Sequence, residues 1–175
     1  MPERKVIERA RADKRAGKSP STQAGEFVKD EIDRVRAGKH GVRSAKQAIA
    51  IGLSKARRAG VDLKPPAKGK TSEATRKKAE QDVAKGQGKQ KASASKESRN
   101  KRSRTTTAVM QRESKEGASS EAMSAQSKSA AARRPASSRS AAAKKAAQTK
   151  GAAGRSAAAK KAAQTRAARA HLGRR

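Results

Sequence analysis

The sequence contains no cysteine, tryptophan or tyrosine, and it has a single phenylalanine, Phe27. Without cysteine, disulfides, thiol catalysis and cysteine-based zinc sites are excluded. With Phe27 as its single such side chain, the chain lacks the aromatic stacking platforms that bind single-stranded nucleic acids and RNA loops. The longest apolar run, AIAIGL from Ala48 to Leu53, is far shorter than the roughly 20 residues of a membrane-spanning helix. No charged segment followed by an apolar stretch opens the chain, so we predict a cytoplasmic location and no membrane partner.

Large apolar side chains are also scarce. Leu, Ile, Val and Phe together number 15 among 175 residues, well below the roughly 20% expected of a globular domain. Twelve of the 15 lie in residues 1–64, so a buried core is expected only there. We predict an all-α protein with a small helical hairpin head of two to three short helices. A long, largely disordered or conditionally helical basic tail is expected to follow it.

Composition and charge indicate where the chain divides into segments. Pro65-Pro66 ends the apolar part of the chain, and neither proline can donate a backbone hydrogen bond. From Ala122 onward there are 14 Lys and Arg and no carboxylate. We therefore predict a head at 1–64, a basic low-complexity linker with weak helices at 65–121, and an Ala/Lys/Arg-rich tail at 122–175. The whole chain has 46 Lys+Arg against 15 Asp+Glu, a net charge of +31, which indicates a polyanionic partner.

Two helices are expected at the start of the head. The first begins after Pro2 and ends before Gly17. The second begins at Ser19-Pro20, an N-cap followed by proline at the first helical position, and ends at Gly38. On this second helix an apolar stripe is expected, with Phe27 beside it; its residues are Ala24, Val28, Ile32 and Val35. Its acidic residues, Glu31 among them, are expected to form ion pairs on the helix surface.

A third helix begins at the capping-box sequence SAKQ, residues 44–47, and ends at Gly60. With the second helix it forms an αα-hairpin. Gly52 in its middle costs about 1 kcal/mol relative to alanine. We explain this glycine by close approach of the partner helix near Phe27 or Val28. Within the connecting loop, His40 is expected to be exposed.

Weaker signals predict helices beyond the head. One runs from Ser72 to Gly86, one from about 107 to 115, and one from about 120 to 133, ended by Pro135. The segment RSAAAKKAAQT occurs twice, at 139–149 and at 155–165. Each copy is shorter than the roughly 12–15 residues at which isolated helices become marginal in water. Gly151 and Gly154, which lie between the two copies, are expected to end the helices. We expect each copy to be disordered alone and to become helical when it binds a polyanion.

The candidate nucleic-acid-binding residues are the basic side chains of the third helix and of the tail. In the head they are Arg43, Lys46, Lys55, Arg57 and Arg58; in the tail they are Arg133, Arg134, Arg139, Lys144, Lys145, Arg155, Lys160, Lys161, Arg166 and Arg169. Each contact with a duplex phosphate contributes about −0.9 to the slope of log K against log salt. The third helix has three open interpretations: a phosphate-facing basic helix, a sequence-specific reader, or a purely structural part of the hairpin.

No residue pattern predicts catalysis. Residues 64–71 end like a phosphate-binding loop, but Lys64 stands where its first glycine is required and no strand precedes it. No spacing of His, Asp or Glu is typical of a metal site. We therefore predict that the protein is not an enzyme and has neither a cofactor nor a metal.

The segments HGVRSAKQAIAIGLSKAR, residues 40–57, and GKSPSTQAGEFV, residues 17–28, carry a family likeness. With the residues around them, 19–66, they resemble a family of small, highly basic bacterial proteins that has no assigned biochemical role. Members of that family are commonly described as DNA-binding or histone-like, and they continue into Lys/Arg/Ala/Ser-rich tails. The resemblance implies a location in the bacterial nucleoid and carries over no catalytic residue.

Together these features predict a non-enzymatic, weakly sequence-selective protein that binds duplex DNA by phosphate neutralisation, in the manner of histone-like nucleoid proteins. Two alternatives stay open. One is an RNA- or ribosome-associated basic protein. The other is a stress-related protein-interaction module that its basic tail only tethers. The oligomeric state does not follow from the sequence.

Overall fold

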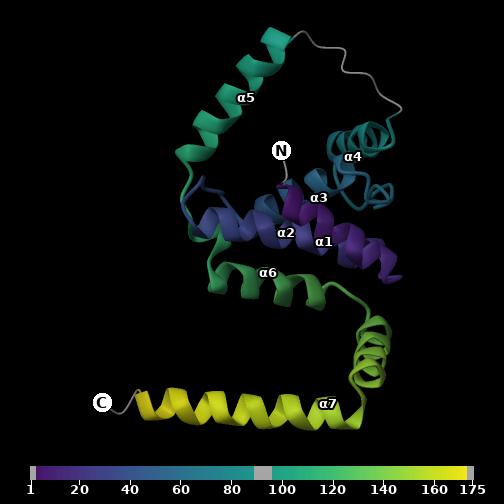
Figure 1. Cartoon of the computed structure of the whole chain (residues 1–175), viewed down its shortest axis with the longest axis vertical. Helices are drawn as coiled ribbons and strands as arrows, with labels where there is room; N and C mark the ends of the chain where they lie inside the picture. The colour runs from purple at the N-terminus through teal and green to yellow at the C-terminus, as the bar shows by residue number, and fades with distance from the viewer. Residues whose placement is uncertain (1–2, 89–95, 173–175) are drawn as a thin grey trace. The chain divides into compact units, whose positions relative to one another are not determined.

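The computed structural model describes residues 3–88 and 96–172, in which all regular structure is helical (Figure 1). The elements are α1 (Arg4–Arg15), α2 (Pro20–Arg36), α3 (Ala45–Arg58), α4 (Glu73–Gly86), α5 (Lys96–Gln111), the 3₁₀ turn η1 (Glu116–Ala118), α6 (Ser120–Ala132) and α7 (Ala136–Leu172). Two compact units divide the chain, Met1–Gln126 and Ser127–Arg175. The all-α prediction is confirmed.

The N-termini of α2 and α3 are capped by the serines that the sequence indicates. Ser19 Oγ accepts the N–H of Thr22 at 3.4 Å, and Ser44 Oγ accepts the N–H of Gln47 at 3.3 Å. The return bond of the predicted capping box is displaced by one residue, because Gln47 Oε1 accepts the N–H of Arg43 at 2.9 Å. Each cap satisfies amides that have no partner within the helix.

The C-termini of α1, α2 and α3 share one glycine motif. Gly17, Gly38 and Gly60 have φ values of 69°, 75° and 87°, a left-handed conformation that disfavours side chains with a Cβ. At each end the residue after the glycine donates its N–H back into the last turn, as Val61 does to Ala56 at 3.1 Å. This is the Schellman arrangement, and it confirms the three predicted helix ends.

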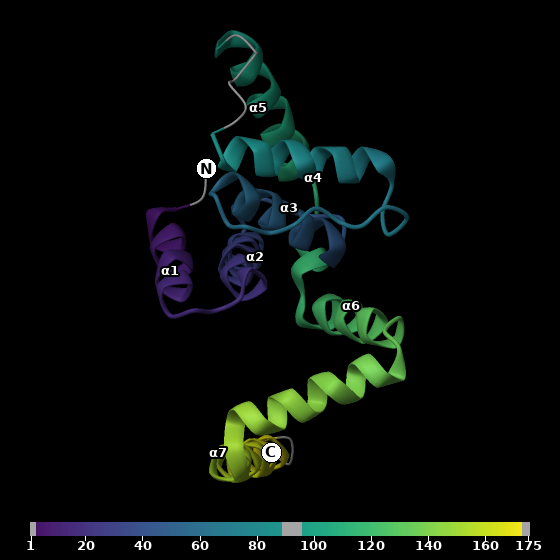
Figure 2. The same cartoon turned by 90° about the vertical axis from the view of Figure 1, so that its right-hand side faces the viewer.

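The hairpin of α2 and α3 is held at close range. A Cβ on Gly52 would lie 2.6 Å from the Cα of Val28, so the predicted reason for this glycine is confirmed. The predicted stripe of α2 is confirmed at Ala24 and Val35, which are buried, but Val28 and Ile32 are only half-buried and Glu31 is buried instead. Because α1 also packs on α2 (Figure 2), the buried side of α2 is the one that faces α1 as well as α3.

Two elements from beyond Lys64 complete the first unit. Helix α4 packs on α3, and a Cβ on Gly86 would lie 2.0 Å from the Arg57 carbonyl oxygen. From η1, Ala118 is buried in a cluster with Val35, Val42 and Ala48. The N–H groups of Gly41 and Val42 donate to the carbonyls of Met110 and Ser114 at 2.8 and 2.9 Å. Segments of the predicted linker therefore supply part of the core around the hairpin.

The expectation of a largely disordered or conditionally helical tail is wrong for the described residues. They form the end of α6 and the 37-residue α7. The prediction treated each repeat copy as an isolated 11-residue helix, but alanine-rich flanks extend both copies past the length at which helices become marginal. Of the two predicted stops, only Gly151 interrupts α7, with φ 64° and ψ 177°, and Gly154 is helical.

Candidate nucleic-acid interface

Helix α7 carries basic side chains around its whole circumference. Arg155 and Arg166 are 11 residues apart, about three turns and 16 Å along one face. Lys160 and Lys161 lie about 140° and 240° around the axis from Arg155. All four side chains are exposed, and no large apolar side chain lies among residues 152–168. This half of α7 therefore has no apolar stripe with which to pack on another protein helix. The first repeat copy places Arg139, Lys144 and Lys145 in the same way.

The cations of the second unit have no acidic side chain to pair with, since the sequence contains no carboxylate after Glu121. Their interactions there are weaker hydrogen bonds. Arg134 donates to Ser138 Oγ at 3.1 Å, and Arg155 Nη1 donates to the Ala147 carbonyl at 2.6 Å. The second bond reaches back across Gly151 and satisfies a carbonyl near the end of the first helical segment. The positive charge of α7 is therefore available to an external anion.

In the head, the structure places two predicted residues inside the fold. Lys55 pairs with Glu31, whose side chain is fully buried. Arg57 is buried and donates through Nε to the Leu63 carbonyl at 3.3 Å. The expectation that Glu31 lies on the helix surface is wrong, because α1 and α3 both cover that side of α2. His40, expected to be exposed, is largely covered, and its Nε2 lies 3.3 Å from Glu31 Oε1.

The other predicted head residues lie at the surface. Arg43 donates to Glu113 Oε1 at 2.7 Å, and this hydrogen bond with its ion-pair attraction raises the pKa of Arg43. Arg58 lies 3.7 Å from Asp82. Lys46 is exposed and forms no ion pair with a described residue. Helix α3 thus divides its cations between core and surface and does not present them as one basic patch.

The predicted tail residues with described side chains are exposed, Arg133 and Arg134 in the turn between α6 and α7 and the others along α7. They are Arg133, Arg134, Arg139, Lys144, Lys145, Arg155, Lys160, Lys161 and Arg166. The side chain of Arg169 lies outside the described residues. The predicted binding residues omitted those of α5, where Lys101 and Arg104 are exposed; the basic run SRNKRSR, residues 98–104, was the signal for them. In the part of the chain that the structure describes, no cluster of three His, Asp or Glu is arranged to hold a metal.

Comparison with known proteins gives one similarity. Residues 11–69 match a family model described as a family of unknown function (DUF6496), which covers about a third of the chain. The match includes all of α2 and α3. It agrees with the resemblance of the head to an uncharacterised family, while DNA binding stays a prediction. No curated protein and no solved structure matches the chain. Among the described helices, none has both the length and the hydropathy of a membrane span.

Proposed function

We propose that the protein is a non-enzymatic, histone-like protein that binds duplex DNA through α7 with little sequence selectivity. The observation that carries this proposal is the exposure of the described cations of α7 in a unit that contains no carboxylate. Such a surface replaces the counterions condensed on DNA, and their release favours binding. In a bacterial cell this activity would place the protein at the nucleoid.

The arrangement of charge on α7 suits a groove. The major groove of B-DNA is about 12 Å wide, admits an α-helix, and has phosphates along both walls. A helix with cations spaced around its axis, as Arg155, Lys160 and Lys161 are, can contact both walls. Alanine and serine make up most of the rest of α7, so few side chains are available for bidentate contacts to base edges. This composition supports binding that depends on phosphates and little on sequence.

The test is a titration of full-length protein with a duplex at several salt concentrations. The variant replaces Lys144, Lys145, Lys160 and Lys161 by Gln, whose helix propensity is close to that of Lys. We expect the slope of log K against log salt to fall in magnitude by about 3 to 4. A matched variant with Arg at the same four positions keeps the charge and should retain the wild-type slope.

Two results would contradict the proposal. One is wild-type affinity in the Gln variant, which would remove α7 from the interface. The other is binding that does not change between low and high salt, which would exclude phosphate neutralisation as its source. The same titration with structured RNA in place of the duplex tests the alternative function. Tighter binding to the RNA than to the duplex would favour an RNA- or ribosome-associated protein.

A further inference from the structure

A cavity of about 560 Å³ lies in the first unit. Helices α3 and α4 and the segment between them form most of its lining. Its walls include the apolar side chains of Ile49, Leu53, Pro66 and Ala74, and its size is within the usual range for small-molecule sites. The family match covers the α3 side of this cavity but not α4, and the proposed DNA-binding surface does not use it.

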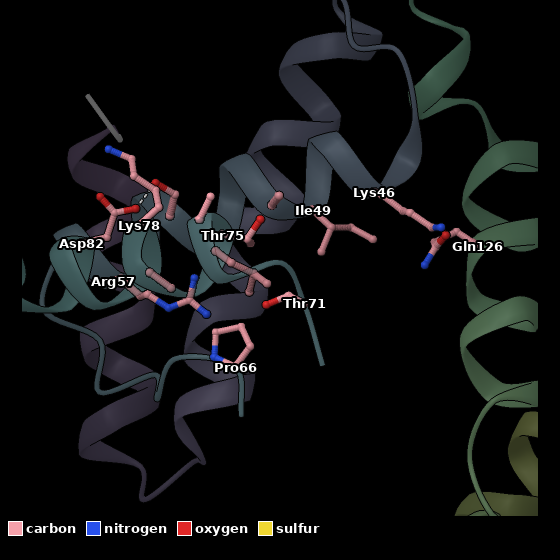
Figure 3. Close-up of a pocket in the computed structure, with 14 residues that line it drawn as sticks. Lys46, Ile49, Arg57, Pro66, Thr71, Thr75, Lys78, Asp82 and Gln126 are labelled. Atoms are coloured by element: carbon pink, nitrogen blue, oxygen red, sulfur yellow. Dashed lines mark hydrogen bonds between the residues drawn. The ribbon is translucent and has the colours of Figure 1, made fainter. Parts of the chain in front are cut away.

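One cation is buried in the lining. Arg57 is only 8% exposed, and its Nε donates to the Leu63 carbonyl. Its two terminal nitrogens have no hydrogen-bond partner among the described residues. Figure 3 shows the Arg57 guanidinium among the residues that line the cavity, on the side of the labelled Pro66 and Thr71 that is away from Gln126. These terminal nitrogens are not among the fully buried polar atoms that lack a partner, so they are open to the cavity and can donate to a bound acceptor.

The nearby acid does not fill this role. Asp82 accepts from Ser54 Oγ at 2.6 Å and lies 3.7 Å from Arg58. It forms no ion pair with Arg57, although its charge acts on it from a distance. Burial lowers the pKa of Arg57, and the attraction of Asp82 opposes this only in part. The cation in the cavity therefore lacks a counter-ion in direct contact among the described residues.

We propose that this cavity binds a small organic carboxylate with an apolar body, held by the terminal nitrogens of Arg57. The planar guanidinium group matches a carboxylate with two parallel hydrogen bonds. The apolar walls accommodate the rest of the ligand. The carboxylate of Asp82 also lines the cavity and disfavours a doubly charged phosphate. A duplex phosphate cannot reach Arg57, since the surrounding head covers this side chain almost completely.

Calorimetric titration of the full chain with phenylacetate tests this site. Phenylacetamide has the same shape without the charge, acetate lacks the apolar body, and inorganic phosphate lacks both the body and the single charge. We expect phenylacetate to bind at least about tenfold more tightly than each of these three probes. Arg57→Gln should lower the affinity by at least about tenfold, whereas Arg58→Gln, at the neighbouring exposed cation, should not change it.

A second variant keeps the test decisive if Arg57→Gln fails to fold. Ala74 is exposed at the cavity wall, so Ala74→Phe should fill the cavity, abolish phenylacetate binding and leave the melting curve and the affinity for duplex DNA unchanged. The proposal is overturned if the wild type does not bind phenylacetate at millimolar concentration, if the amide binds equally well, or if a folded Ala74→Phe protein binds as the wild type does. Displacement of phenylacetate by inorganic phosphate or by a short duplex would also overturn it. If Ala74→Phe abolishes phenylacetate binding and keeps the affinity for duplex DNA, the carboxylate site and the DNA-binding surface are independent, so the two proposals can fail separately.

Discussion

At the scale of single residues, the first unit depends on two glycines and two carboxylates that the surrounding elements cover. Gly52 and Gly86 stand where a Cβ would meet the backbone of the neighbouring helix. Glu31 and Asp82 are buried acids in a chain with a large excess of cations. Buried ionised groups require partners to offset the loss of hydration, and these acids have them in Lys55 and Ser54. The core is therefore specified by a few close polar and backbone contacts as well as by apolar area.

Gly52→Ala should destabilise the protein, although alanine is the better helix former. The new Cβ would lie 2.6 Å from the Cα of Val28, so α2 and α3 must separate, at a net cost of about 1–3 kcal/mol. The matched control is Gly25→Ala, also within a helix, where a Cβ meets nothing within 4 Å. This control should stabilise the protein by about 0.5–1 kcal/mol. Urea denaturation measures both effects; equal changes in the two variants would contradict the close approach.

Glu31→Gln should lower the free energy of unfolding by about 3 kcal/mol, because it leaves Lys55 buried without its counter-ion. Asp33→Asn removes an acid from the same helix, but its pair with Lys29 is exposed, so the loss should stay below about 0.5 kcal/mol. Adding Lys55→Met to Glu31→Gln should recover part of the lost stability. A loss in Glu31→Gln as small as in Asp33→Asn would place Glu31 at the surface.

At the scale of elements, α7 differs from the helices of the head. Each head helix ends in a Schellman motif and packs against its neighbours through an apolar face. The described side chains of α7, in contrast, are almost all exposed. Its order comes from its alanine-rich composition, since alanine has the highest helix propensity. Gly151 is the point at which its direction changes (Figure 1).

Gly151→Ala should straighten α7, since a φ of 64° with a ψ of 177° is accessible essentially only to glycine. The chain has no cysteine, so spin labels on cysteines introduced at Ser140 and Gln164 report one distance. In a straight helix these positions are about 36 Å apart. We expect a shorter distance in the parent and a shift toward the straight value in Gly151→Ala. Gly154→Ala, at a helical position, should leave the distance unchanged; a shift there instead would move the break away from Gly151.

At the scale of the molecule, the first unit extends to Gln126 and includes α4 and η1. The apolar residues of 1–64 are too few to form a stable domain without staples or partners. Contacts from later in the chain supply some of the missing burial, as Ala118 does against Val42. The second unit contributes charge, and its net positive charge is not balanced by any carboxylate.

A fragment of residues 1–126 should therefore unfold cooperatively with the same thermal midpoint as the full chain. A fragment of residues 1–64 should melt at lower temperature and without a cooperative transition, because it exposes the α4-facing side of α3 and the Val42 cluster. Circular dichroism at 222 nm follows both fragments. If the 1–64 fragment melted at the same temperature as the 1–126 fragment, α1 and the hairpin would be sufficient for stability, and α4 and η1 would add none.

The sequence by itself determined the ends of the three head helices and the separation of charge, but not the bounds of α5, which is Lys96–Gln111 where a helix at about 107–115 was expected. Ser19, Ser44 and the glycines after each head helix act through local backbone geometry, and the lack of acids after Glu121 is a matter of composition. These features need no knowledge of distant contacts. Even the close approach at Gly52 was predictable, since a glycine within an amphipathic helix requires a steric reason.

Only the tertiary structure decided which side chains are buried. Glu31, Lys55 and Arg57 have the residue types of a solvated helix surface, and their burial follows from the packing of α1 and α4 on the hairpin. Helix faces covered by a third element cannot be identified from the periodicity of one helix, because periodicity reports a single apolar direction. The same limit applies to the cavity around Arg57, which exists only where α3, α4 and the segment joining them come together.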